Sequence, residues 1–375
     1  MMTPAQIWLV VAAVAIAAVT FAALPAAMSA LLRHMFTAPH QTPWKGGSTR
    51  LRLIDVGGLP AQALNSAERL RDLSSRTEDG DGGNAFQRRD GDVWVVSYVK
   101  SGTTWTIGIL AALWDHPAAE YAGNLQKVTR TFCPQPELPD LGWGDNGFGH
   151  SIDELNAWPT SSGRRCFKSH WPSRDFHRVD AEPSSDDGAA TGKSKYIYVM
   201  RNALDQITSH WNQVYGMGFH YGTEDLTFGG GWDGFVEDWL SGDVENGKWF
   251  DHVASWYARS RDDPDVLLVR FEELKSNPSD VIRRIADFVG TETTPRDIQS
   301  VMETTSFDKM RRADEEDVGL RFMRFLGVLR RSHVRQGEVG SGKSRFSNEQ
   351  LAALEREYKK ILEPLGVPRE WVLLD

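Results

Sequence analysis

The sequence has 375 residues, of which 41% are hydrophobic and 25% are charged. This composition excludes a fully disordered chain, a collagen-like fibre and a polytopic transporter. The formal net charge of −9 excludes a globally basic surface, so no nucleic-acid partner is predicted. The two cysteines, Cys133 and Cys166, are too few for a disulfide scaffold or a four-cysteine zinc site.

The N-terminus is strongly apolar, and no charged side chain precedes Arg33. The apolar run at 7–32 is longer than the ~20 residues that a membrane-spanning helix needs. We therefore predict one hydrophobic helix in residues 1–33 that anchors the chain in a membrane. A cleaved signal or organelle-targeting sequence and a buried core helix are the alternatives. The nearest basic residues all follow the run, so the positive-inside rule predicts a cytosolic catalytic domain. Golgi, secretory-pathway or organelle targeting is the alternative.

Residues 34–90 are predicted to be a linker and N-terminal extension that ends in a loop rich in Gly and Asp. Apolar runs then indicate buried strands at 93–99, 165–170, 196–200 and 266–271. Helical patterns follow at 106–114, 201–214 and 278–290. Alternating strands and helices predict an α/β fold in which a central parallel sheet is flanked by helices. We expect residues 91–375 to form one such domain.

The segment between the first strand and the first helix reads KSGTTW (100–105). This P-loop-like strand–loop–helix suits an anion, because a helix N-terminus exposes unpaired N–H groups with partial positive charge. Glycine allows the backbone to approach the anion closely, and hydroxyl groups add donors. The residues predicted to bind the anion are Lys100, Ser101, Gly102, Thr103 and Thr104, and Trp105 offers a flat face on which an aromatic base could stack. An ordinary strand-to-helix turn with a Ser or Thr cap is the alternative.

A second segment, GEVGSGKS (337–344), matches the Walker A pattern formally. This pattern binds phosphate only between a buried strand and a helix. Here the polar sequence RRSHVRQ precedes it, close to the C-terminus. The context therefore argues against a P-loop kinase or NTPase, which is kept as an alternative function.

Several motifs occur in a fixed order along the chain. They are YVKSGTTW (98–105), FKSHWP (167–172), YVMRNALDQITSHW (198–211), VRFEELKSNPSDVIRRIADFVG (269–290), TTSFDKM (304–310) and VRQGEVGSGK (334–343). In this order they resemble the cytosolic-type sulfotransferase family, which uses 3'-phosphoadenosine 5'-phosphosulfate (PAPS) as sulfuryl donor and releases 3'-phosphoadenosine 5'-phosphate (PAP).

The resemblance implies a catalytic base, His170, with a lysine beside it. The implied catalytic residues are His170, Lys100, Lys168 and Ser209. It also implies that Arg201 and Ser209 bind the 3'-phosphate, which a C-terminal loop clamps from the other side. Besides residues 100–105, the implied donor-binding residues are Arg201, Ser209, Phe271, Thr305, Ser306, Phe307, Met310, Arg335, Gln336 and Gly337.

The chain departs from the family pattern at three places. Phe271 replaces a tyrosine, Gln336 replaces a lysine, and GSGK (340–343) replaces GDWK. These changes imply weaker clamping of the 3'-phosphate. Residues 346–353 do not match the family's dimer motif, which argues against family-type dimerisation.

These residue types suit sulfuryl transfer to a hydroxyl or amine of a small, possibly lipophilic acceptor. A neutral imidazole can take the acceptor's proton near physiological pH. Cationic side chains can stabilise the charge that develops on the leaving oxygen and on the sulfonate, so no metal is predicted. Besides a kinase or NTPase, the alternative is a catalytically silent, membrane-tethered nucleotide-binding protein.

Overall fold

The computed structural model describes residues 86–137, 150–176, 193–216, 231–244, 246–318, 321 and 337–374. The predicted membrane helix, most of the predicted linker, and the predicted donor-site residues Arg335 and Gln336 lie outside these ranges. Among the described helices, none combines the length and the apolar character that crossing a membrane requires.

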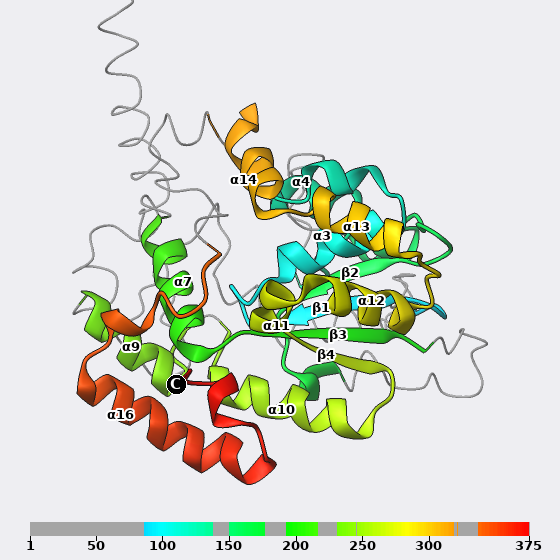
Figure 1. The fold of residues 1–375 in the computed structure, drawn as a ribbon. Helices are drawn as coiled ribbons and strands as arrows, with labels where there is room; N and C mark the ends of the chain where they lie inside the picture. The colour runs from blue at the N-terminus through cyan, green and yellow to red at the C-terminus, as the bar shows by residue number, and fades with distance from the viewer. Residues whose placement is uncertain are drawn as a thin grey trace, which may run out of the picture.

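The centre of the domain is a four-stranded sheet in the order β2-β1-β3-β4, with every neighbouring pair parallel (Figure 1). The strands are β1 (Val93–Ser97), β2 (Cys166–Ser169), β3 (Lys195–Met200) and β4 (Val266–Arg270). All residues of β1 and β2 are buried, as expected for parallel strands that are covered on both faces. The sheet confirms the α/β fold that the four apolar runs predict.

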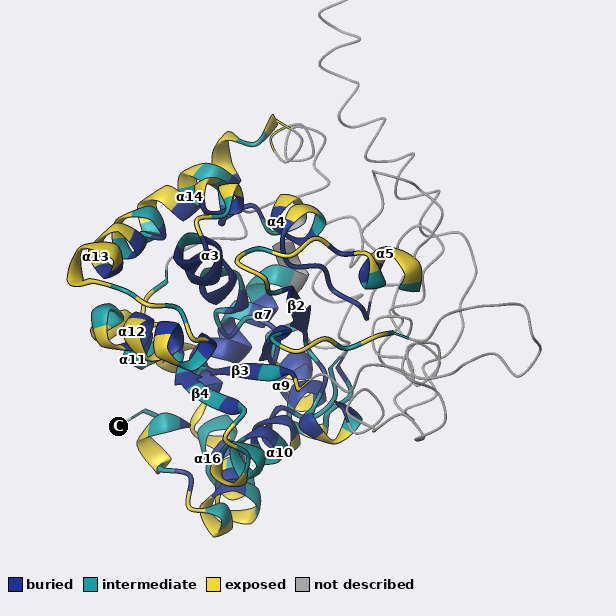
Figure 2. Cartoon of the chain, turned by 90° about the vertical axis from the view of Figure 1, so that its right-hand side faces the viewer, coloured by how far each residue is buried: buried dark blue, intermediate teal, exposed yellow. Residues whose placement is uncertain are grey.

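Helices cover both faces of the sheet. They are α3 (Thr103–Leu113), α4 (Leu125–Thr131), α5 (Ile152–Asn156), α7 (Ala203–Gly216), α9 (Gly231–Ser241), α10 (Trp249–Asp262), α11 (Phe271–Ser276), α12 (Pro278–Val289), α13 (Pro295–Thr304), α14 (Phe307–Glu316) and α16 (Asn348–Glu357). Figure 2 shows that α3 is buried along most of its length, whereas α13 and α14, farther out, carry exposed residues.

Alternation along β1 divides the apolar interior into two cores. Val93 and Val95 pack with the buried residues of α3, α12 and α13. Trp94 and Val96 pack with those of α7, α9, α10 and α16. Successive side chains of a strand point to opposite faces, so each core belongs to one face of the sheet.

A buried ion pair fixes the start of the two strands that lead into the site. The guanidinium Nη2 of Arg165 lies 2.6 Å from Oδ2 of Asp92, and both side chains are almost fully inaccessible. Asp92 directly precedes β1, and Arg165 directly precedes β2. A second guanidinium nitrogen donates to the carbonyl of Leu155 at 2.9 Å. The pair therefore links the neighbouring strands at their amino ends, opposite the carboxyl ends that carry the candidate site.

The loop after β1 begins and ends earlier than the sequence pattern predicts. The strand stops at Ser97 because Lys100 has a φ of 63° and Gly102 a φ of 110°, both in the left-handed region. Helix α3 starts at Thr103, three residues before the predicted start, and the N–H of Thr106 already bonds to the carbonyl of Gly102 at 3.1 Å.

Candidate active site

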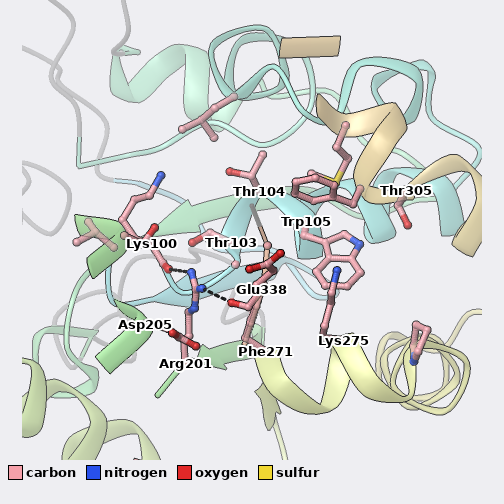
Figure 3. A pocket seen from close by; sticks show the side chains of 18 of the residues that line it. Lys100, Thr103, Thr104, Trp105, Arg201, Asp205, Phe271, Lys275, Thr305 and Glu338 are labelled. Carbon is pink, nitrogen blue, oxygen red and sulfur yellow. Dashed lines mark hydrogen bonds between the residues drawn. The ribbon is translucent and has the colours of Figure 1, made fainter. Parts of the chain in front are cut away.

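A cavity of about 380 Å³ opens at the carboxyl ends of β1, β2 and β3 (Figure 3). Open parallel sheets bind their ligands at this edge. The predicted site residues that line it are Lys100, Gly102, Thr103, Thr104, Trp105, Lys168, His170, Arg201, Ser209, Phe271, Thr305, Ser306, Phe307, Met310 and Gly337. The structure therefore brings together side chains that are spread over more than 200 residues of sequence.

The loop between β1 and α3 has polar groups that are available to a ligand. Gly102 caps α3 without a side-chain hydrogen bond, so no side chain of the cap satisfies the first-turn N–H groups. The hydroxyl of Ser101 and the indole N–H of Trp105 are buried and find no hydrogen-bond partner among the described residues. Ser101 is the one loop residue that does not line the cavity. Groups of this kind fit a phosphate or sulfate.

Arg201 joins the loop after β1 to the C-terminal loop. Its Nη1 donates to the carbonyl oxygen of Lys100 and its Nη2 to that of Glu338, each at 3.3 Å (Figure 3). The guanidinium carbon lies 4.5 Å from the ring centroid of Phe271, a cation–π distance. Phe271, which stands where the family has a tyrosine, thus packs against Arg201, the residue that is predicted to bind the 3'-phosphate.

The C-terminal loop is held against α7 by Asp205. The N–H groups of Gly340 and Gly342 donate to the two oxygens of this carboxylate at 2.8 and 3.0 Å. A Cβ on Gly342 would lie 2.6 Å from the carbonyl oxygen of Leu204, and one on Gly337 would lie 2.8 Å from the ring of Phe307. The glycines are therefore needed for close packing of this loop.

The packing of this loop also argues against a phosphate-binding Walker A loop at residues 337–344. Two of the N–H groups that would have to cradle a phosphate are bonded to a carboxylate of the protein. A three-residue 3-10 turn follows at Lys343–Arg345, where a phosphate-binding loop needs the N-terminus of an α-helix. The structure does not support a P-loop kinase or NTPase at this segment.

His170 is held with one ring nitrogen free to act as a base. Its Nδ1 lies 2.7 Å from the carbonyl oxygen of Ser97. Because a carbonyl only accepts, Nδ1 must carry the hydrogen, and the neutral ring keeps the lone pair on Nε2. Burial, and then the charge of Lys168, lower the pKa of His170 well below its ordinary value, against the opposing effect of the Ser97 hydrogen bond. The imidazole is therefore neutral near pH 7.

The main chain of His170 is fixed on both sides by side chains from elsewhere in the fold. Its N–H donates to Oε1 of Glu137 at 2.5 Å, and its carbonyl accepts from Nε2 of His252 at 3.1 Å. Burial lowers the pKa of His252 to about 3, so this second imidazole is also neutral. The hydroxyl of Tyr198 donates to Nδ1 of His252 at 3.1 Å.

Lys168 lines the cavity although its side chain is almost fully buried. Its ammonium donates to the amide oxygen of Gln135 at 2.5 Å. The amide nitrogen of Gln135 in turn donates to the carboxylate of Glu137. No motif identifies Gln135 or Glu137, because each lies 33 positions from its partner, in an irregular segment.

Several further polar residues line the cavity that were not among the predicted site residues. They are Asp205, Thr208, Gln213, Lys275, Glu338 and Ser341. Asp205 and Gln213 lie four residues on either side of Ser209 in α7, so helical spacing would have placed them on the same face. The other four carry no such signal.

The arrangement is that expected of a group-transfer enzyme: a strand–loop–helix with an uncapped helix N-terminus shares a cavity with a neutral imidazole and three lysines, Lys100, Lys168 and Lys275. A comparison with protein families then identifies the family to which this enzyme belongs. A sulfotransferase domain model matches residues 90–366, and the chain belongs to the sulfotransferase domain family. This confirms the family resemblance of the motifs.

Curated relatives agree with this assignment. Rat sulfotransferase 1C2 is 28% identical over 316 residues, which cover 84% of this chain and 93% of the relative. Mouse sulfotransferase 1B1 is 28% identical over 279 residues, which cover 73% of this chain and 84% of the relative.

Two solved structures share the fold. Mouse sulfotransferase SULT7A1 complexed with PAP has a TM-score of 0.55 at 24% identity and covers 80% of this chain and 90% of its own. Retinol dehydratase, in a complex with retinol and PAP, has a TM-score of 0.56 at 23% identity and covers 74% and 83%.

The electrostatic coupling of His170 to Lys168 predicts a pH effect. A cation beside an imidazole disfavours its protonation, so Lys168→Met should raise the pKa of His170. The acidic limb of kcat/KM, where the base becomes protonated, should then move to higher pH in this variant than in the wild type. A pH–rate profile of both proteins measures the shift. An unchanged limb, or one moved to lower pH, would contradict the assignment of this limb to His170.

Proposed function

We propose that this sulfotransferase moves the sulfuryl group of PAPS to a hydroxyl of a small, lipophilic acceptor, with His170 as base; an amine is the other acceptor class. One observation supports this above all. The hydrogen bond from Nδ1 of His170 to Ser97 leaves Nε2 unprotonated, and the same residue lines the cavity with Lys100 and Lys168.

The donor site fits PAPS in its chemistry. The uncapped N-terminus of α3 and the ammonium of Lys100 line the cavity and offer donors and charge to the phosphosulfate. For Ser101, which does not line the cavity, the predicted contact stays a prediction. Trp105 lines the cavity beside Phe271, with ring centroids 5.8 Å apart, and offers an aromatic surface to the adenine. Arg201 and Ser209 would hold the 3'-phosphate. The two related solved structures that contain PAP support this choice of donor.

The remaining donor contacts follow from the motifs. Thr305, Ser306, Phe307 and Met310 line the cavity and would face the adenine. Gly337 lies against Phe307 and begins the described part of the C-terminal loop. Arg335 and Gln336, outside the described residues, are proposed to complete the clamp on the 3'-phosphate.

The chain's residues would divide the chemical work as follows. PAPS supplies a sulfuryl group whose bond to the bridging oxygen breaks as PAP leaves. Nε2 of His170 takes the proton of the acceptor hydroxyl while the oxygen of this hydroxyl forms the new bond to sulfur. Lys100 stabilises the charge on the bridging oxygen, and Lys168 stabilises the sulfonate oxygens. Ser209 orients the 3'-phosphate end. This division of roles requires no metal.

A lipophilic acceptor is proposed because of the apolar N-terminus and a related structure. A membrane anchor would deliver acceptors that partition into lipid. Retinol dehydratase, a structural neighbour, has been solved with retinol and with androsterone. Neither compound is assigned to this chain.

The proposal is tested with ³⁵S-labelled PAPS and an acceptor panel of 2-naphthol, a steroid alcohol, a long-chain alcohol and a primary amine. The expected result is labelled product from at least one lipophilic alcohol or phenol. PAP binding without transfer to any member would favour the catalytically silent nucleotide-binding protein.

We propose further that residues 1–33 anchor the protein in a membrane with the catalytic domain in the cytosol. The charge-free apolar run and the basic residues after it support this topology. Protease protection of a C-terminally tagged chain in sealed vesicles tests it. A tag that is digested without detergent is expected, whereas a protected tag would indicate a lumenal domain.

A further inference from the structure

Glu137 is a buried carboxylate for which neither the family motifs nor the comparisons give a role. Its side chain is inaccessible to solvent. Oε1 accepts hydrogen bonds from the hydroxyl of Ser169 and from the backbone N–H of His170, and Oε2 accepts from the amide of Gln135. Burial raises the pKa of Glu137 above its ordinary value and outweighs the lowering effect of these hydrogen bonds and of the charge of Lys168. Three donors satisfy the ionised form, which only accepts.

The same carboxylate is linked to the second catalytic group. Lys168 donates to Gln135, and Gln135 donates to Glu137. A buried ammonium is costly unless it is hydrogen-bonded and its charge is compensated. Glu137 supplies a compensating charge, and Gln135 bridges the two charged groups. The chain of hydrogen bonds from Glu137 through Gln135 therefore holds the ammonium of Lys168 at the cavity.

The segment that carries both residues is itself tied to β2. The N–H of Lys168 donates to the carbonyl of Pro134 at 2.9 Å, and the buried thiols of Cys133 and Cys166 are in contact. Gln135 and Glu137 consequently have a fixed position relative to the strand that ends in the base. A movement of either side chain would shift Lys168 or His170 relative to the cavity.

We propose that Glu137, together with Gln135, is a positioning residue that keeps His170 and Lys168 at a fixed distance and orientation relative to each other. Its carboxylate holds the main chain of His170 directly, and it holds the ammonium of Lys168 through Gln135. The proposal rests on the proposed function, because it assigns these two groups to sulfuryl transfer. Displacements of about 1 Å at such groups cost about 100-fold in rate.

The test is Glu137→Gln in the full-length protein, assayed with ³⁵S-PAPS and the best acceptor of the panel. The amide keeps the volume but presents N–H groups where Glu137 accepts. We expect kcat to fall about 10- to 100-fold, as for other residues that orient catalytic ligands, with the dissociation constant of PAP within about threefold of wild type. The exposed Glu370→Gln, distant from the cavity, is the matched control and should behave as wild type.

A second variant, Gln135→Leu, breaks the link to Lys168 but leaves the carboxylate on His170. It should lower kcat less than Glu137→Gln does, again with PAP affinity retained, and it decides the question if Glu137→Gln does not fold. If the wild-type enzyme is active and the folded variants have the same kcat, the inference is wrong. It is also wrong if PAP affinity and kcat fall in parallel in these variants. Wild-type protein without any transfer would overturn the proposed function and this inference with it.

Discussion

His170→Ala should abolish sulfuryl transfer while the protein still binds PAP. The imidazole is the proposed base, because its Nδ1 is bonded to Ser97 and burial lowers its pKa so that the ring is neutral. General-base catalysis contributes about 10²- to 10⁴-fold, so kcat should fall by at least that order. The loss is measured with ³⁵S-PAPS, and PAP affinity is measured by calorimetry on the same samples.

The control for this variant is His116→Asn. His116 lies outside the cavity and accepts a hydrogen bond from the N–H of Ala118 through its ring, a function that asparagine can replace at a helix start. Its transfer rate should match that of the wild type. Substantial transfer by His170→Ala would show that another group takes the acceptor's proton.

Gly102→Ala should weaken PAP binding by about 10- to 100-fold, because the loop relaxes in the free variant and PAP must restore a backbone conformation that costs a non-glycine residue about 1–3 kcal/mol. The added Cβ would lie 2.8 Å from Cδ2 of Phe271, and Gly102 has a φ of 110°. Either the loop changes conformation or Phe271 moves. Because Arg201 stacks on Phe271, both responses disturb the donor site.

Gly163→Ala separates backbone strain from this specific contact. Gly163 also has a positive φ, of 76°, but a Cβ there would meet no atom within 4 Å. This variant should lose some thermal stability and keep PAP affinity. Equal losses of affinity in the two variants would contradict a donor site at the loop after β1, and so would wild-type affinity in Gly102→Ala.

The sheet was predictable because parallel strands are buried on both faces and therefore appear as continuous apolar runs. All four runs are strands, and the three helical patterns correspond to α3, α7 and α12. The errors lie at the loop after β1. Hydrophobic periodicity does not show that Lys100 and Gly102 adopt left-handed backbone, nor that Thr103 and Thr104 belong to the first turn of the helix.

The lining of the cavity was predictable where it depends on local sequence order. Residues 100–105, His170 and Arg201 each lie at the end of a strand, and their motifs are contiguous. The residues that support them come from distant segments, as Glu137 and His252 do, and tertiary packing alone brings them to His170. Asp205 was visible in its motif, but its contact with the glycines of the C-terminal loop depends on packing 135 residues away.

The central claim is that the strand–loop–helix at Lys100 binds PAPS, and that the cavity transfers its sulfuryl group without a metal. The most direct measurement compares ³⁵S-PAPS with γ-³²P-ATP as donor in the presence of EDTA or Mg²⁺. We predict ³⁵S-labelled product in EDTA and no labelled product from ATP in either condition. Mg²⁺-dependent phosphoryl transfer from ATP that is lost in Lys343→Ala, without any ³⁵S transfer, would contradict the account.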